Sequence, residues 1–279
     1  MCNFIMVDES RNRDIAEAVK GIVQAVPIYE DAIQPAAKQI GKGLETIAKA
    51  MQVALEPLAG LVWGYDRFKE QFLIPVAEKL RNVPPDRITT PSFHVAGPIV
   101  EALRFTGHEE SLRELYANLL ATSLDAETTK NAHPSFVDII KNMSPDEARI
   151  IRLFATSLEF PVISLHSRHN VGMAYNVVVR NFSYIGREAA CEHPELVPSY
   201  LDNLCRLGLI EIPPDRQLSD VASYEPLQSA HELATFREQI DALGDRTVAF
   251  DRKVAVITTL GEQFCQACVI EKGSPSAAT

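Results

Sequence analysis

Apolar residues recur at a helical spacing through the first half of the chain. Weaker stripes run from Ile15 to Val26 and from Ile33 to Leu55. Thr90 and Pro91 predict the N-cap and first turn of a helix that reaches about Phe105. The clearest stripe recurs three and four positions apart, at Leu112, Leu115, Tyr116, Leu119, Leu120 and Leu124. This period predicts a first half built of several helices.

The pattern changes after residue 143. Ser144-Pro145-Asp146-Glu147 is a capping box with proline at the first helical position, so a new helix is expected to begin at Pro145. A fresh cap there predicts a domain boundary near Met143. The apolar runs "PVISL" from Pro161 and "YNVVVRNF" from Tyr175 then predict strands.

The last third predicts a helix, two strands and a closing helix. A helical face between Glu195 and Leu207 is followed by Gly208, which is typical of a helix end, and by a strand over 209–212. The run "KVAVITTLGEQFCQACV" predicts a strand that leads into a helix capped by Thr259 and Glu262. This order is typical of a winged-helix domain in which "LIEI" pairs antiparallel with "VAVI".

A long insertion, residues 213–252, replaces the wing in this interpretation. It contains a predicted helix from Pro226 to Leu243, with an apolar face at Leu233, Phe236, Ile240 and Leu243. The predicted fold is therefore mainly α (α+β): an N-terminal multi-helix domain, 1–143, followed by a winged-helix-like domain, 144–270. Residues 1–54 are expected to form an arm for oligomerisation or membrane binding, and 271–279 a flexible tail.

Composition and charge narrow the functional classes. The chain has 27 basic and 37 acidic residues and a net charge of −10, which argues against non-specific attraction to nucleic acid or anionic lipid. Its five cysteines show no framework spacing, so we expect reduced thiols and a cytoplasmic protein. Charged residues interrupt the most apolar region, so none of its uninterrupted apolar stretches is long enough to span a bilayer.

Four stretches together resemble a known family. They are "AGPIVEALRFTGHEESLRELYANLLATSLD", "AHPSFVDIIKNMSPDEARII", "LCRLGLIEI" and "TTLGEQFCQAC". The chain resembles the abortive-infection alpha family (Abi-alpha), a bacterial and phage domain of unknown function, over roughly Leu55 to Cys268. The block from Pro98 to Glu147 is the most specific part. The family name implies a connection to phage exclusion, and the resemblance implies no particular reaction.

Polar residues near the strong stripes are candidates for structural or interaction roles. His133 precedes Pro134 and a short helix, and it is expected to cap that helix or to bond a neighbour, since no nucleophile or acid is signposted beside it. Glu101 and Arg113 are compatible with a partly buried ion pair between two packed helices, and equally with an ordinary solvated face. Asn118 lies on the same helical segment as Arg113.

Three short pairs have metal-ligand residue types: Cys265 with Cys268, Cys191 with His193, and His166 with His169. Cys265 and Cys268 fall within an amphipathic helical pattern, where cysteine behaves as a small apolar residue. No second CxxC accompanies them, so no metal is expected. Phosphate-binding and hydrolase motifs are absent, and neither a cofactor nor a catalytic residue is predicted.

We therefore predict a non-enzymatic phage-defence protein that acts through protein–protein interaction. Its expected partner is an unidentified protein or a second copy of itself, in a homo-oligomer. Two alternatives remain. Amphipathic N-terminal helices can perturb the inner membrane as a peripheral effector. The winged-helix-like domain can act as a DNA-binding regulator, although the expected recognition helix offers one arginine against two acids.

Overall fold

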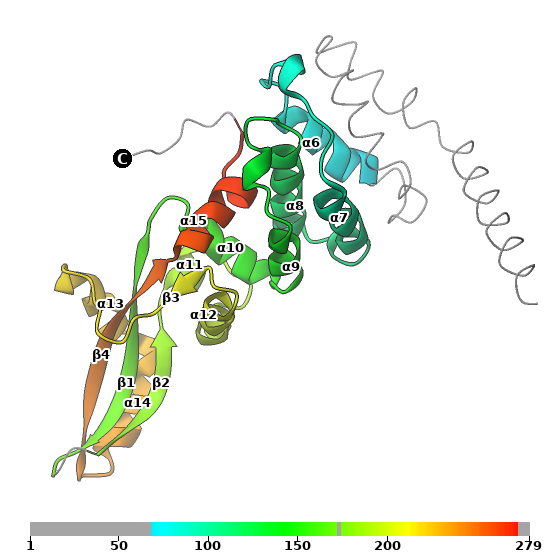
Figure 1. Cartoon of the computed structure of the whole chain (residues 1–279). Coiled ribbons are helices and arrows are strands. Elements are labelled where there is room, and N and C mark those ends of the chain that lie inside the picture. The colour runs from blue at the N-terminus through cyan, green and yellow to red at the C-terminus, as the bar shows by residue number, and fades with distance from the viewer. Residues whose placement is uncertain (1–67, 172–173, 273–279) are drawn as a thin grey trace, which may run out of the picture. The chain divides into compact units, whose positions relative to one another are not determined.

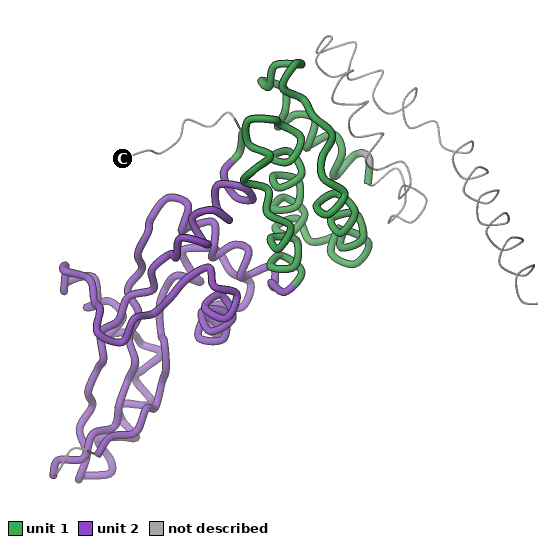
Figure 2. The backbone as a smooth tube through the Cα atoms, in the orientation of Figure 1, with its two compact units in different colours: residues 1–141, 271–275 green, residues 142–270, 276–279 purple. Residues whose placement is uncertain are grey.

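The computed structural model describes residues 68–171 and 174–272. They form two compact units, shown in Figure 2. Among the described residues, unit 1 comprises 68–141 with Glu271 and Lys272, and unit 2 comprises the rest of 142–270. The division lies at Asn142, next to the predicted boundary at Met143. The predicted N-terminal arm, 1–54, lies outside the described residues, as does the tail beyond Lys272.

The chain mixes helices with one antiparallel sheet, so the α+β class predicted from the sequence is confirmed (Figure 1). Unit 1 is helical, with α6 (Ile74–Lys79), α7 (Phe93–Thr106), α8 (Glu110–Ser123) and α9 (Ser135–Lys141). The predicted stripe of α8 is confirmed, because its apolar residues are all buried. α8 contacts α6, α7 and α9 and thus forms the centre of this unit.

The start of α7 differs from the prediction. The N-cap is Ser92, whose Oγ accepts a hydrogen bond from the backbone N–H of His94 at 3.3 Å, and not Thr90. The backbone of Thr89 instead donates to the carbonyl of Leu124, at 2.9 Å. This bond and the bridge between Ile88 and Asp125 hold the preceding segment extended, so the helix begins later.

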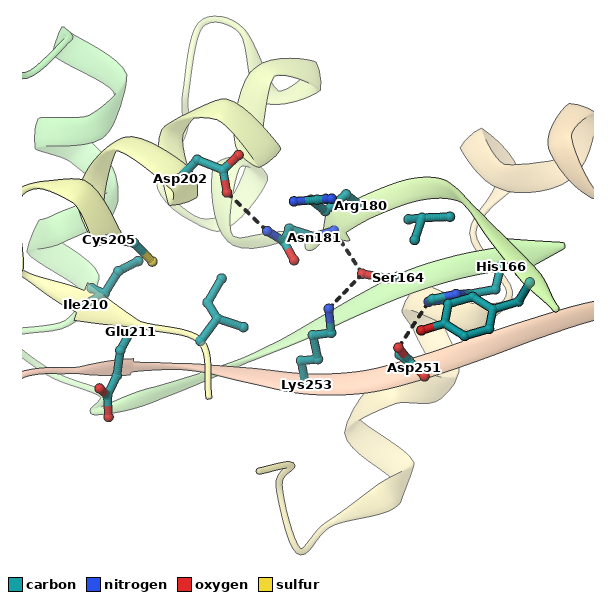
Figure 3. Close-up of a pocket in the computed structure, with 13 residues that line it drawn as sticks. Ser164, His166, Arg180, Asn181, Asp202, Cys205, Ile210, Glu211, Asp251 and Lys253 are labelled. Atoms are coloured by element: carbon teal, nitrogen blue, oxygen red, sulfur yellow. Dashed lines mark hydrogen bonds and ion pairs between the residues drawn. The ribbon is translucent and has the colours of Figure 1, made fainter. Parts of the chain in front are cut away.

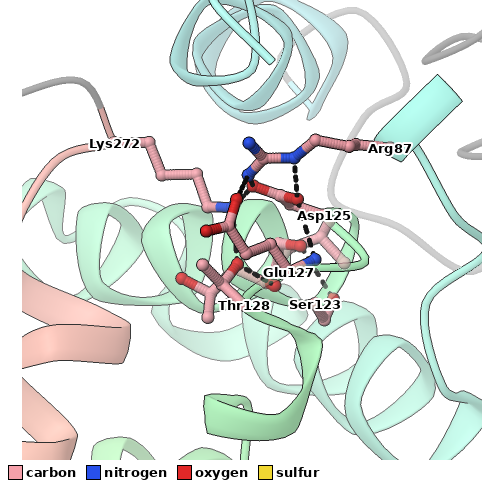
Figure 4. Close-up of polar contacts among 8 residues, drawn as sticks. Arg87, Ser123, Asp125, Glu127, Thr128 and Lys272 are labelled. Atoms are coloured by element: carbon pink, nitrogen blue, oxygen red, sulfur yellow. Dashed lines mark hydrogen bonds and ion pairs between the residues drawn. The ribbon is translucent and has the colours of Figure 1, made fainter. Parts of the chain in front are cut away.

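Glu271 and Lys272 correct the prediction of a flexible tail from residue 271. Lys79 Nζ lies 2.8 Å from Glu271 Oε1, and Lys272 Nζ lies 2.7 Å from Asp125 Oδ2. Figure 4 shows Lys272 and Arg87 converging on the Asp125 carboxylate. Two ion pairs, one of them with the buried carboxylate of Asp125, therefore hold the first two residues of the expected tail.

Unit 2 contains a four-stranded antiparallel sheet in the order β2-β1-β4-β3. The strands are β1 (Glu159–His169), β2 (Tyr175–Phe182), β3 (Ile210–Glu211) and β4 (Arg246–Ile257). The predicted pairing of "LIEI" with "VAVI" is confirmed, with Ile210 opposite Ile257. β1 pairs with β4 along its whole length, so this short pair lies at one end of a longer ladder.

The insertion folds differently from its prediction. The continuous helix expected from Pro226 to Leu243 is broken into α13 (Glu225–Gln228) and α14 (Ala234–Asp241). Ser229 Oγ donates back to the carbonyl of Glu225 at 2.7 Å, and Ala230 leaves the helical conformation. The end of the insertion, from Arg246, belongs to β4.

The two faces of the sheet have different roles. On one face Ile163 and Leu165 pack with residues of the insertion, which form a buried cluster with them: Tyr224, Leu227, Ala230, Leu233 and Ile240. Figure 1 shows α14 lying against the long strands. Because side chains alternate along a strand, Ser164 and His166 of β1 point to the opposite face. The insertion thus covers one face and leaves the other for polar side chains.

The helices of unit 2 are anchored on α10 (Pro145–Leu153). The capping box predicted at its start is confirmed: Ser144 N–H donates to Glu147 Oε2 at 2.6 Å, and Glu147 N–H donates to Ser144 Oγ at 3.2 Å. Asp146, at the second helical position, accepts from the backbone of residues 192 and 193 and from the hydroxyl of Tyr200 in α12 (Val197–Arg206). One buried carboxylate therefore joins three segments.

The last helix, α15 (Thr259–Phe264), begins one residue earlier than its predicted cap implies. Thr258 is the N-cap, and its Oγ1 accepts from the N–H of Gly261 at 2.9 Å. The same hydroxyl donates to the carbonyl of Gly208 at 2.5 Å. Gly208 has φ +74°, as its predicted role at a helix end requires. Within the described ranges, no helix has the length and apolar character needed to cross a membrane.

Candidate functional site

A polar pocket of about 550 Å³ opens on the uncovered face of the sheet in unit 2. Its lining comes from β1, β2, β3, β4 and α12, so segments distant in sequence meet there (Figure 3). This volume lies within the range of about 300–1,000 Å³ that is usual for small-molecule sites. Its walls combine charged, hydroxyl and apolar side chains.

Ser164 of β1 lies at the floor of the pocket and is 1% exposed. Its Oγ accepts hydrogen bonds from Lys253 Nζ of β4 and from the backbone N–H of Asn181 in β2, both at 3.3 Å. Figure 3 shows these three residues meeting at one point. The two donors occupy both lone pairs of the hydroxyl, so Ser164 acts as a link between strands.

Asn181 has an unusual backbone. Its φ is +50°, in the left-handed region that asparagine tolerates better than most residues. The pairing of β1 with β2 is irregular at this point, because Ile163 faces Phe182 while Leu165 faces Val179. The resulting β-bulge turns the N–H of Asn181 towards Ser164, and its Nδ2 donates to Asp202 Oδ1 of α12 at 3.3 Å. The bulge thus shapes the wall of the pocket.

Charged side chains of both signs line the pocket: the basic Arg180 and Lys253, and the acidic Asp202, Glu211 and Asp251. His166 is buried, with Nε2 3.1 Å from Asp251 Oδ2 at an angle that does not form a hydrogen bond. The ring centroids of His166 and Tyr175 are 4.9 Å apart. Neither Arg180 nor Lys253 forms an ion pair with any residue in the described part of the chain.

Cys205 is the thiol of the pocket. Burial, followed by the negative charges of Asp202 and Glu211, raises its pKa to about 11. The thiol is therefore protonated at neutral pH and is a poor nucleophile. Cys205 contributes a small, weakly polar surface to the wall.

The four residues proposed from the sequence all belong to unit 1, and the pocket belongs to unit 2. Glu101 is exposed on α7, and Arg113 of α8 donates from Nη1 to the carbonyl of Gly107 at 2.7 Å. The ion pair considered between them is not formed, because Arg113 instead binds the C-terminal end of α7. Asn118 is buried in α8. His133 is exposed, and its Nδ1 accepts from the N–H of Ser135 at 3.1 Å, which is the helix-capping role considered for it.

The fold disfavours metal binding by the histidine pair and by the pair of C-terminal cysteines for different reasons. His166 and His169 lie three residues apart on β1, so their rings point to opposite faces of the sheet. Cys265 and Cys268 are buried in the helical segment that ends the described fold. Burial raises the pKa of Cys265 to about 12 and that of Cys268 further, which disfavours the thiolate form that metals require.

Sequence reasoning missed the pocket residues Ser164, Arg180, Asn181 and Lys253. Each falls within a strand-like run, and the pairing of β1 with β4 that brings Lys253 to the others joins segments distant in sequence. One signal was present: an asparagine within the run "YNVVVRNF" is a residue that accommodates a positive φ, and hence a bulge. The pairing that brings the four together is visible only in the folded chain.

Comparisons with known proteins give a family and one solved structure. A search of curated proteins gives no match. The chain is similar to an uncharacterized protein from the hydrocarbon-degrading marine bacterium Alcanivorax borkumensis SK2, at 20% sequence identity, over 52% of this chain and 96% of that one. The TM-score of 0.35 is too low for a shared fold to follow. The family model described as abortive infection alpha matches residues 64–268, which is most of the chain. The protein therefore belongs to the abortive infection alpha family.

Proposed function

We propose that this protein acts in phage defence by binding another protein, without catalysing a reaction. Membership of the abortive infection alpha family supports the connection to phage defence. The observation that supports binding is the exposed edge strand β2. It pairs with β1 on one side only among the described strands, and it presents Tyr175, Val177 and Val178 with exposed fractions of 58%, 45% and 37%.

An edge strand of this kind suits the addition of an extended segment from a partner. Its outer N–H and C=O groups can continue the ladder, while apolar side chains contribute buried area. Soluble proteins usually protect such edges with charges, proline or a covering element. The run from Tyr175 to Val179 has no charged residue, and what protects it among the described residues is its irregular pairing with β1. We infer that a partner strand covers it.

The geometry of the pocket supports binding in preference to catalysis. Ser164 is hydrogen-bonded to Lys253 and Asn181, and no hydrogen bond joins it to His166. A nucleophilic serine needs a base at hydrogen-bond distance that can accept its proton. Cys205, the other potential nucleophile, has a raised pKa. These residues are better placed to shape a binding surface.

The winged-helix-like interpretation of unit 2 belongs to the same proposal, as an interaction module. α10, α11 (Ile185–Glu188), α12, β3, β4 and α15 follow one another in the expected order, with the β1–β2 hairpin between α10 and α11. α12 exposes Asp202 and Arg206, and the Nε of Arg206 donates to Asn203 at 2.9 Å. A helix that reads a DNA groove needs more free basic and amide side chains than this.

The test compares phage plating on cells that express matched valine-to-lysine variants. Val178→Lys places a charge on the β2 edge, and Val221→Lys places the same charge on an exposed turn of the insertion, where the valine is 42% exposed. We expect wild type and Val221→Lys to protect cells, and Val178→Lys to lose protection while its melting temperature stays close to wild type. Equal protection by both variants would reject the edge as the binding surface.

A second arm addresses catalysis. Ser164→Ala removes a potential nucleophile of the pocket, and His166→Gln removes a potential base. We expect both variants to protect cells as long as they fold, as judged by circular dichroism. Lost protection in a variant with an unchanged melting temperature and unchanged partner binding would indicate an enzyme. If deletion of the gene leaves the plating efficiency of every tested phage unchanged, the proposed role in defence is rejected.

A further inference from the structure

The two cations of the pocket, the half-buried Lys253 and the exposed Arg180, have no counter-ion among the residues that the structure describes. Lys253 is partly buried, and within the described ranges its Nζ has one hydrogen-bond partner, Ser164 Oγ. An ammonium group carries three N–H donors, so two remain for a ligand. Holding such a charge out of bulk water costs free energy unless an acceptor or an anion satisfies it.

Arg180 supplies a second cation on the other side of the pocket. It lies on β2 beside the bulge, is exposed, and forms no hydrogen bond or ion pair with a residue that the structure describes. Figure 3 shows Arg180 above the Ser164 hydroxyl and Lys253 below it. A guanidinium group can donate two parallel hydrogen bonds to a phosphate or carboxylate.

The acids of the pocket do not neutralise this pair. The Asp202 carboxylate accepts from Asn181, and that of Asp251 lies beside His166. The Glu211 side chain points away from Lys253 in Figure 3. The two aspartates still repel an anion, so they lower the affinity of the site without occupying its cations.

The apolar side chains of the pocket can contact an organic group attached to the anion. Val177 of β2 and Ile210 and Ile212 around β3 line the same pocket of about 550 Å³, and the Tyr175 ring packs against the ring of His166. Burial of an organic group against these residues adds to affinity in proportion to its apolar area. The pocket therefore combines an anion-binding end with an apolar wall.

We propose that this pocket binds a small organic anion, whose phosphate or carboxylate group lies between Lys253 and Arg180. The apolar part of the ligand packs against Val177 and the two isoleucines. The proposal does not rest on the proposed protein partner: Tyr175 and Val177 border both surfaces, but the two cations that hold the anion are not among the residues assigned to the edge contact. The protein can fail the plating test of the β2 edge and still bind an anion in the pocket, and the reverse.

The experiment measures binding of phenyl phosphate, benzoate and the neutral benzyl alcohol to the full chain by calorimetry. We expect saturable binding of one or both anions and none of the alcohol, and the tighter anion identifies phosphate or carboxylate as the preferred group. Arg180→Gln and Lys253→Gln should each weaken binding about tenfold, as loss of a charged hydrogen bond implies. Arg180 is exposed, so Arg180→Gln should not disturb folding. This variant therefore tests the anion site even if Lys253→Gln unfolds.

Arg252→Gln is the matched control. Arg252 adjoins Lys253 on β4, points to the opposite face, and donates to Gln228. The Arg252→Gln variant should bind both anions with the same affinity as the wild-type protein. Asp202→Asn should tighten binding about two- to threefold, since it removes a repelling charge. Absence of saturable anion binding, equal loss in Arg252→Gln and Arg180→Gln, or weaker binding by Asp202→Asn would overturn the proposal.

Discussion

Asp125 and Lys272 are 147 residues apart in sequence, yet Lys272 Nζ lies 2.7 Å from Asp125 Oδ2. The Asp125 side chain is 3% exposed, and Arg87 donates to both of its oxygens. Lys272 also donates to Thr128 Oγ1 at 2.6 Å. A carboxylate at the end of α8 therefore attaches the C-terminal segment to unit 1.

Asp125→Asn should lower the free energy of unfolding by about 2 kcal/mol, because it leaves two cations without their buried counter-ion. Urea unfolding followed by circular dichroism measures the change. Glu127→Gln is the control: Glu127 pairs with the same Arg87 but is 66% exposed, so its loss should cost about 0.5 kcal/mol or less. Equal effects of the two substitutions would contradict the role assigned to Asp125.

Stability should fall in acid because two buried carboxyl groups have lowered pKa values. Burial acts to raise the pKa of Asp125, but hydrogen bonds from Arg87 and Lys272 outweigh it; for Asp146, backbone N–H groups do the same. The unfolded chain therefore binds more protons than the folded one between the folded pKa and the ordinary carboxyl value of about 3.9.

This stabilisation is fully present above about pH 5 and is lost as the pH falls through the folded pKa values. Urea unfolding at a series of pH values below neutrality should show the loss. Asp125→Asn, which does not titrate, should show a shallower dependence on pH. An identical slope in wild type and variant would show that Asp125 is not among the groups responsible.

Two glycine-to-alanine substitutions should have opposite effects. A Cβ at Gly261 in α15 would lie 2.0 Å from the carbonyl oxygen of Leu209, which is backbone and cannot move aside. Gly261→Ala should therefore destabilise unit 2 by more than about 2 kcal/mol. A Cβ at Gly97 in α7 meets no atom within 4 Å beyond its own helical turn, so helix propensity favours Gly97→Ala. Pro98 disfavours a helical alanine before it, so the gain in stability should be no more than about 0.5 kcal/mol. Melting temperatures of the two variants test both directions.

The four cysteines of the described ranges should react slowly with iodoacetamide. Burial, as the largest cause, raises the pKa of Cys191 and Cys205 to about 11 and that of Cys265 to about 12, so little thiolate exists at neutral pH. Cys268 is fully buried and should react last. Peptide mass spectrometry before and after unfolding in urea gives the comparison. Rapid labelling of Cys265 in the folded protein would contradict its placement.

Duplex DNA should bind no more tightly than about 10⁻⁵ M at physiological salt. The chain has a net charge of −10, and α12 exposes one arginine beside Asp202. Fluorescence anisotropy with the gene's own promoter and with a random duplex measures this. Nanomolar binding that depends on sequence and weakens steeply with salt would identify a regulator instead.

The sequence by itself determined the local elements and the family. The α8 stripe, the Ser144–Glu147 capping box and the Gly208 helix end were predicted because each depends on residues within a few positions of one another. The α+β class followed from the change in apolar spacing after residue 143. Helix starts at Ser92 and Thr258 were misplaced by one or two residues, since neighbouring hydroxyl residues compete for the cap.

The tertiary structure alone decided the pocket and the break within the insertion. Ser164, Asn181 and Lys253 lie on three strands, and their meeting depends on the antiparallel pairing of β1 with both β2 and β4 and on the irregular register between β1 and β2. The register of a strand depends on which of its two faces is buried. The apolar residues of α13 and α14 pack on Ile163 and Leu165, so the face of β1 with these two residues is the buried one. The local periodicity of the sequence does not indicate which face of β1 is buried, because this depends on packing against residues that are distant in sequence.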